Sequence, residues 1–96
     1  MRAAERLRVA LIRRGIDCDV HGGYGLALVS VWTGLIVWCN GDRYWWCAGW
    51  LAQERRPAYA SARCGDPDQA AVRVARRYAR LRAVHPPAPK LSAGPV

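Results

Sequence analysis

The 96-residue sequence contains no phenylalanine, a single lysine (Lys90), and 7 acidic residues against 15 basic ones. Without phenylalanine, the large aromatic positions of a core must be filled by tryptophan and tyrosine. Because lysine is almost absent, the basicity comes from arginine, which is typical of proteins encoded by high-GC genomes. The net charge of +8 favours anionic partners such as nucleic acid, an acidic protein surface or anionic lipid.

Long apolar runs are also absent. The longest candidate, GLALVSVWTGLIVWC, is interrupted by Ser30, Thr33 and Gly34 and falls short of the roughly 18 residues of a membrane span. The opening MRAAERLRVALIRRG has charges scattered through it and lacks the apolar centre of a secretory signal. We therefore expect a cytoplasmic protein without a membrane partner, whose four cysteines are reduced thiols.

Motifs for catalysis and metal binding are incomplete. The segment HGGYG resembles part of an esterase oxyanion loop, but the sequence has no G-x-S-x-G motif and no Walker A or G-x-G-x-x-G pattern. Cys18 and His21 have the C-x-x-H spacing of half a zinc site, yet the other three cysteines supply no second paired motif. We predict a protein that is not an enzyme and has no metal or cofactor, with its cysteines packed as small apolar residues.

Two helices are predicted near the ends of the chain. Residues 2–14 have an apolar stripe and are followed by Gly15, the residue type favoured just past a helix C-terminus. The second helix begins with Asp66 as its N-cap and Pro67 in its first position, and it extends to about residue 84.

The segment between the helices has the β-branched and aromatic composition of strands. Strand candidates are residues 18–21, 26–32, 35–39, 43–51 and 58–63. Thr33-Gly34 predicts a tight turn, and Asn40-Gly41 predicts a two-residue type I′ turn that would place Cys39 opposite Asp42.

The expected fold is therefore α+β: a helix, an antiparallel sheet of three to five strands and a second helix, with both helices on one face of the sheet. This single domain would occupy residues 1–84, and residues 85–96 would form a flexible proline-rich tail.

The predicted hairpin would have aromatic side chains on both faces, because side chains alternate along a strand. One face would hold Ile36, Trp38, Arg43, Trp45 and Cys47, and the other Leu35, Val37, Tyr44, Trp46, Ala48 and Trp50. Two helices cover one face only, so we interpret Leu35, Val37, Tyr44 and Trp46 as core and the face with Trp38, Arg43 and Trp45 as a candidate contact surface. Alternatively, these aromatics fill ordinary core positions, and loops or the C-terminal tail cover that face.

The second helix has a stripe of basic residues opposite its apolar stripe. The stripe consists of Arg73, Arg76, Arg77 and Arg80, at positions i, i+3, i+4 and i+7. Asp68 is the only acidic residue after the N-cap, so the stripe has no salt-bridge partner within the helix. It fits phosphates or an acidic protein face; otherwise it is an ordinary solvated helix face.

The run GYGLALVSVWTGLIVW, the strand containing WW and the segment DPDQAAVRVARRYARLR resemble a family of small actinobacterial proteins. Members of that family often lie beside helix-turn-helix regulators in streptomycete-type genomes, so the resemblance implies a regulatory accessory and transfers no site residues.

The order of helix, strands and helix is also similar to double-stranded RNA-binding domains. That family grips phosphate with a lysine-rich motif at the start of its second helix, where this sequence has the acidic GDPDQ.

Together these features predict a small non-enzymatic binding module or regulatory accessory with a basic, aromatic surface. We expect it to contact nucleic acid through the arginine stripe, with bases stacked on Trp38 or Trp45. The alternative is a protein–protein interaction module that uses the tryptophan face to bind an acidic regulator or a second copy of the chain.

Overall fold

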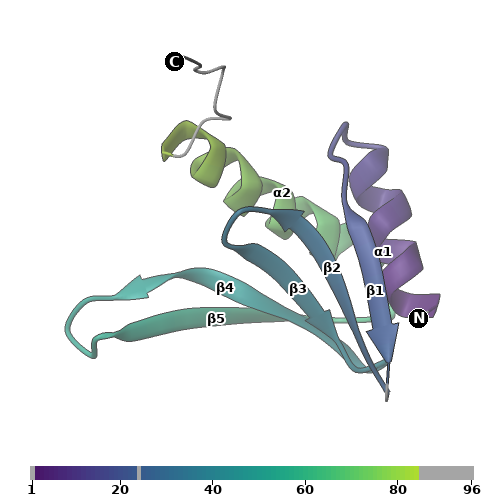
Figure 1. Cartoon of the computed structure of the whole chain (residues 1–96), viewed down its shortest axis with the longest axis horizontal. Coiled ribbons are helices and arrows are strands. Elements are labelled where there is room, and N and C mark those ends of the chain that lie inside the picture. Colours follow the sequence, from purple (N-terminus) through teal and green to yellow (C-terminus); the bar gives the residue numbers. More distant parts are fainter. Residues whose placement is uncertain (1, 24, 85–96) are drawn as a thin grey trace, which may run out of the picture.

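The computed structural model describes residues 2–23 and 25–84 and confirms the α+β class (Figure 1). Helix α1 spans Arg2–Ile12 and helix α2 spans Pro67–Val84. Between them lie β1 (Asp19–Gly23), β2 (Leu26–Trp32), β3 (Leu35–Cys39), β4 (Arg43–Leu51) and β5 (Arg56–Arg63). The predicted tail, residues 85–96, lies outside the described residues. Neither helix has an apolar stretch long enough to cross a membrane.

The five strands form one antiparallel sheet in the order β1-β2-β3-β4-β5, so each strand pairs with its neighbour in the sequence. Antiparallel neighbours can be joined by tight turns, which suits a chain of this length. The predicted Thr33-Gly34 turn is confirmed, because Trp32 pairs directly with Leu35. Gly34 has a φ of 79°, a conformation that glycine adopts without steric cost.

The predicted hairpin between β3 and β4 forms, but its predicted register is wrong. Cys39 pairs with Tyr44, not with Asp42. The side-chain oxygen of Asn40 accepts hydrogen bonds from the backbone N–H groups of Asp42 and Arg43, at 2.9 and 3.0 Å. This side-chain turn replaces the type I′ turn and lengthens the loop. Because the register shifts by an even number of residues, the side chains next to the turn stay on their predicted faces.

The predicted helix ends are confirmed to within two residues. After α1, Gly15 has a φ of 78°, and the N–H of Ile16 donates to the carbonyl of Leu11 at 3.0 Å, a bonding pattern that often ends helices at glycine. At the start of α2, the Asp66 carboxylate accepts a hydrogen bond from the N–H of Gln69 at 3.1 Å, as expected of an N-cap.

Alternate strand residues form a buried face of the sheet, here called the inner face. Its buried side chains include Ala27, Val29, Leu35, Val37, Tyr44, Trp46 and Ala62. They form one cluster with Ala4, Leu7 and Leu11 of α1 and with Ala70, Ala71 and Val74 of α2. Four of the residues predicted as core in the hairpin, Leu35, Val37, Tyr44 and Trp46, are thus confirmed as core.

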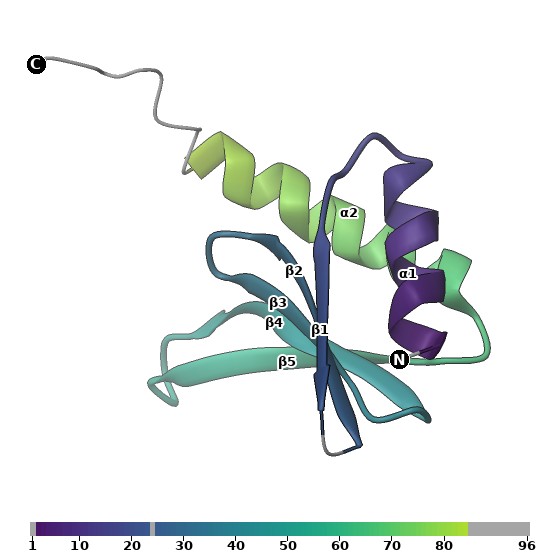
Figure 2. The same cartoon turned by 45° about the vertical axis from the view of Figure 1, so that its right-hand side comes forward.

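Both helices lie on the inner side of the sheet (Figure 2), and two side chains of β4 hold them there. The fully buried hydroxyl of Tyr44 donates a 2.6 Å hydrogen bond to the carbonyl of Ala3 in the first turn of α1. Trp46, two residues further along, has the guanidinium of Arg73 on α2 at 5.2 Å from its ring centroid. A cation over a tryptophan face contributes about 0.5–2 kcal/mol, depending on how far both groups are desolvated.

The C-terminal half of α2 is held by a stack of two rings and one cation. Trp32 and Tyr78 meet edge to face, with ring centroids 5.8 Å apart. Arg82 lies 5.2 Å from the Trp32 ring and donates a 3.0 Å hydrogen bond to the Tyr78 hydroxyl. These contacts matter because the fully buried residues of α2 all lie in its first half.

A buried thiol pair and the buried Tyr44 hydroxyl make the folded state sensitive to pH. The Sγ atoms of Cys39 and Cys64 lie 3.5 Å apart in the core. Burial, together with the contact to Cys39, raises the pKa of the Cys64 thiol to about 12. Burial also raises the pKa of Tyr44 well above its usual value of 10.0. The fold therefore favours the neutral form of both groups.

We predict that the free energy of unfolding decreases as the pH rises above about 9. In the unfolded chain Cys64 ionises near its usual pKa of 9.0 and Tyr44 near 10.0, whereas the folded protein keeps both protons to higher pH. The folded state then binds more protons than the unfolded state, so this stability is fully present below pH 9 and is lost above it. Urea unfolding from about pH 7 to pH 10.5 measures the change.

The variant Tyr44→Phe tests the same prediction by removing one of the two titrating groups. It leaves the Ala3 carbonyl without its donor, so stability at neutral pH should fall by about 1–3 kcal/mol. The loss of stability at alkaline pH should also be smaller, since one of the two groups is gone. Tyr59→Phe is the control, because the Tyr59 side chain is 62% exposed and its hydroxyl can bind water. Equal effects of the two substitutions would contradict the role given to Tyr44.

Candidate functional site

The structure places the predicted contact residues on opposite sides of the sheet. Trp38, Arg43 and Trp45 lie on the face that the helices leave uncovered, here called the outer face. The arginines of α2 lie on the other side, where Arg73 packs over the inner-face residue Trp46. The predicted residues therefore form two separate surfaces instead of one.

The centre of the outer face is a row of side chains that crosses all five strands. In order of pairing, the row is His21, Leu28, Trp38, Trp45 and Ser61. Trp38 and Trp45 are direct partners on adjacent strands, with roughly 5 Å between their Cα atoms. The two predicted tryptophans are thus brought together.

Large apolar side chains are exposed across the outer face. The exposed fractions are 43% for Leu26, 40% for Ile36, 37% for Trp38, 63% for Trp50 and 62% for Tyr59. Strands β2, β3, β4 and β5 all contribute, and Trp45 lies half-buried among these residues. Soluble monomers seldom leave a large contiguous apolar area in water, so this face has the character of a contact surface.

The prediction that Trp50 lies on the same face as Tyr44 and Trp46 is wrong. A β-bulge at Ala48 shifts the pairing of β4 with β5, so that Trp50 pairs with Pro57. The extra residue reverses the alternation of side chains, and Trp50 joins Tyr59 on the outer face. Gly49 is the sequence signal for this change, because glycine inside a strand often marks a bulge.

Two arginines face each other on the outer face. Arg43 of β4 pairs directly with Arg63 of β5, and like charges in such a pair repel. Arg43 donates a 3.0 Å hydrogen bond to the Ser61 hydroxyl. Within the described part of the chain, no carboxylate lies within ion-pair distance of either arginine. An anion bound between them would relieve the repulsion. Arg63 is a further candidate contact residue, and the sequence did not indicate it because the pairing of β5 with β4 was not predicted.

A pocket of about 290 Å³ opens beside Trp38. Its lining consists of His21, Gly22, Gly23, Leu26, Leu28 and Trp38. Gly23 pairs with Leu26 on the outer face and has no side chain to fill this space. The volume lies just below the roughly 300–1,000 Å³ of typical small-ligand sites.

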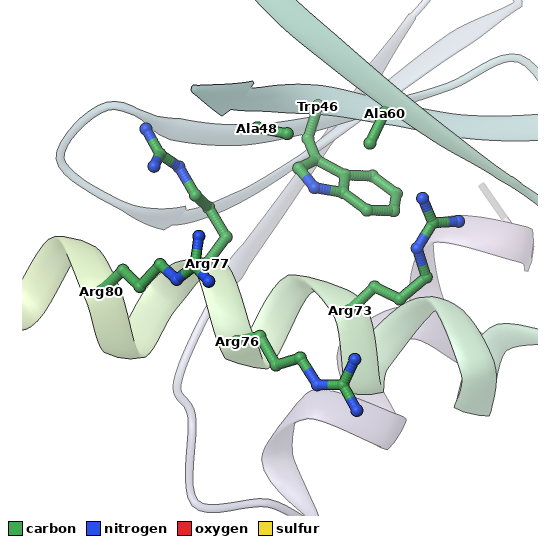
Figure 3. A pocket seen from close by; sticks show the side chains of 7 residues that line it. All are labelled: Trp46, Ala48, Ala60, Arg73, Arg76, Arg77 and Arg80. Atoms are coloured by element: carbon green, nitrogen blue, oxygen red, sulfur yellow. The ribbon is translucent and has the colours of Figure 1, made fainter. Parts of the chain in front are cut away.

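The arginines of α2 line a second hollow, here called the arginine cleft, between α2 and the strands β4 and β5 (Figure 3). Its lining residues are Trp46, Ala48, Ala60, Arg73, Arg76, Arg77 and Arg80, and its volume is about 210 Å³. Arg73 donates a 2.7 Å hydrogen bond to the Ser61 carbonyl in addition to packing over Trp46. The Nε atom of Arg77 is buried and has no hydrogen-bond partner among the described residues.

The half zinc site considered from the sequence acquires no further ligands. Cys18 is buried just before β1, and His21 is exposed on the outer face of β1. Within residues 2–23 and 25–84, no three cysteine, histidine or acidic residues group closely enough to hold a metal ion.

Comparisons with models of protein families, with curated proteins and with solved structures find no match to this chain. The resemblances to small actinobacterial proteins and to double-stranded RNA-binding domains therefore stay predictions. Two surfaces of the molecule are candidates for a functional site: an exposed aromatic face with paired arginines, and an arginine-lined cleft on the opposite side of the sheet.

Proposed function

We propose that this protein is a small cytoplasmic binding module without catalytic activity, which holds single-stranded nucleic acid against the outer face of its sheet. One observation supports this most directly. Trp38, Trp50 and Tyr59 are exposed on the same face as Arg43 and Arg63, which face each other without a carboxylate partner among the described residues. Aromatic side chains beside cations are the usual elements of a single-strand site.

Each group on this face has a matching group on a nucleic acid strand. Bases stack on exposed aromatic rings regardless of sequence, because every base has a π-face. Phosphates neutralise the Arg43–Arg63 pair and release bound counterions. From Trp45 to Trp50 the strand β4 runs about 16 Å, several times the 3.4 Å that one DNA strand advances per nucleotide. The face is therefore long enough for several nucleotides.

The start of α2 is a poor place for phosphate, in contrast to double-stranded RNA-binding domains. The Asp66 carboxylate already occupies the N–H of Gln69, and Asp68 adds a second negative charge in the first turn. These charges stabilise the positive end of the helix dipole and repel phosphate. We therefore place the nucleic acid on the outer face.

Protein–protein interaction through the same face is the second candidate function. Leu26, Leu28 and Ile36 are aliphatic side chains that bases do not need and that protein interfaces use. An acidic partner suits the Arg43–Arg63 pair, whereas a second copy would bring together two chains that each have a net charge of +8.

We predict that Trp38→Ala and Trp50→Ala each weaken binding of a single-stranded oligonucleotide by about 1–3 kcal/mol, because each removes a stacking platform. Fluorescence anisotropy with a labelled oligonucleotide measures the dissociation constants. Ile12→Ala is the control, since Ile12 is also apolar and 42% exposed but lies on α1. If the control weakens binding as much as the tryptophan variants, the bases do not stack on the outer face.

We also predict that the double variant Arg43→Gln/Arg63→Gln flattens the dependence of log K on log salt by about 1.4, or about 0.7 for each single-strand phosphate contact removed. The matched control is Arg13→Gln/Arg14→Gln, which removes the same charge from exposed positions beyond the end of α1. Equal flattening in both variants would mean that the overall field of the protein, and not this pair, binds the strand.

Sedimentation of the same variants separates the two candidate functions. If wild type binds no oligonucleotide at low salt and instead self-associates, and if Trp50→Ala abolishes the self-association at any salt, the face is a protein interface.

A further inference from the structure

The arginine cleft concentrates positive charge that nothing in the described chain neutralises. Its four arginines fall within residues 73–80 of α2, at spacings where like charges on a helix repel each other. The ion pairs in the described residues are Glu5–Arg8 and Glu54–Arg56, both away from the cleft. The repulsion therefore persists until an anion enters.

One of the four arginines is held in place before any ligand arrives. Arg73 is held by the Ser61 carbonyl and by the Trp46 ring. Figure 3 shows Arg73 and Arg77 extending from α2 toward β4 on either side of Trp46. The Arg77 Nε donor is buried and has no acceptor among residues 2–23 and 25–84, an arrangement that proteins usually avoid. A ligand oxygen at this point would supply the missing acceptor.

The size of the cleft restricts what it can hold. Its volume of about 210 Å³ is smaller than the roughly 300–1,000 Å³ of sites that enclose whole small molecules. The cleft therefore has room for a compact group and not for a whole cofactor. The strand side of the cleft is formed by Trp46, Ala48 and Ala60, so the donors come from the helix.

We infer that the arginine cleft is a second ligand site that binds a phosphate-bearing group. The planar guanidinium presents paired N–H donors that match the oxygens of phosphate, and it stays charged at any physiological pH. The group is either the terminal phosphate of a nucleic acid strand or a free phosphate compound. This inference goes beyond the proposed function, because the cleft shares no residue with the outer face.

Inorganic pyrophosphate is the first probe, titrated into the purified protein by calorimetry and by thermal melting. Wild type should bind it saturably and melt at a higher temperature as its concentration rises. Arg77→Lys keeps the charge but removes Nε and the planar fork, so it should weaken binding by at least about tenfold. Arg13→Lys, at an exposed position outside the cleft, is the matched control and should bind as wild type does.

A pair of oligonucleotides of one sequence identifies the source of the phosphate. If the cleft takes a strand end, the 5′-phosphorylated oligonucleotide binds more tightly than the 5′-hydroxyl one, and Arg77→Lys abolishes the difference. If the two oligonucleotides bind equally while pyrophosphate binding still depends on Arg77, the cleft serves a free phosphate compound.

Three results would overturn the inference. The first is the absence of saturable pyrophosphate binding by a folded wild type. The second is equal weakening in Arg77→Lys and Arg13→Lys, with both variants folded by circular dichroism. The third is loss of pyrophosphate binding in Arg43→Gln/Arg63→Gln, which would move the anion to the outer face. Sodium chloride at matched ionic strength serves as the blank, because general screening raises no saturable signal.

Discussion

Tyr44 and Trp46 lie two residues apart on β4, and each contacts a different helix. The Tyr44 hydroxyl bonds to the backbone of α1, and Trp46 packs under Arg73 of α2. Because residues at i and i+2 of a strand point to the same side, this pair brings both helices to one face of the sheet. A chain of 96 residues has no third helix in its described part to cover the other face. The aromatic side chains of the other face are thus exposed because both helices pack against the inner face.

Neighbouring tryptophans have opposite roles for the same reason. Trp46 is 2% exposed in the core, while Trp45 beside it lies in the central row of the outer face. An antiparallel sheet usually alternates apolar residues with polar ones, so that its uncovered face is polar. Here the alternation is between two sets of apolar residues, and the bulge at Ala48 adds Trp50 to the uncovered set. No helix or strand in the described part of the chain covers this second set.

Local chemistry made much of the fold predictable from the sequence. Gly15 and Asp66 mark helix ends because a positive φ and an N-cap each require particular residue types. The faces of the side chains next to the turn were predicted correctly despite the wrong register. Side chains alternate with a period of two, and the register was wrong by two residues. The register itself depended on whether Asn40 used its backbone or its side chain to make the turn. Trp50 was misplaced because one extra residue in a strand reverses every later side chain. The helical spacing of the arginines showed that they share a face, but it could not show which strands that face meets.

Both surfaces include residues of β4 and β5. The side chains of these strands are small on the inner side and large on the outer side. On the inner side, Ala48 and Ala60 are small, and the space that they leave becomes part of the arginine cleft. On the outer side, Trp50 and Tyr59 are large and exposed. Beyond their pairing with β3, these strands continue as a two-stranded ribbon, which on its own is only marginally stable in water (Figure 1). The hydrogen bond from Arg73 to the Ser61 carbonyl therefore stabilises the ribbon, because it connects β5 to α2 at the residue where the ribbon begins.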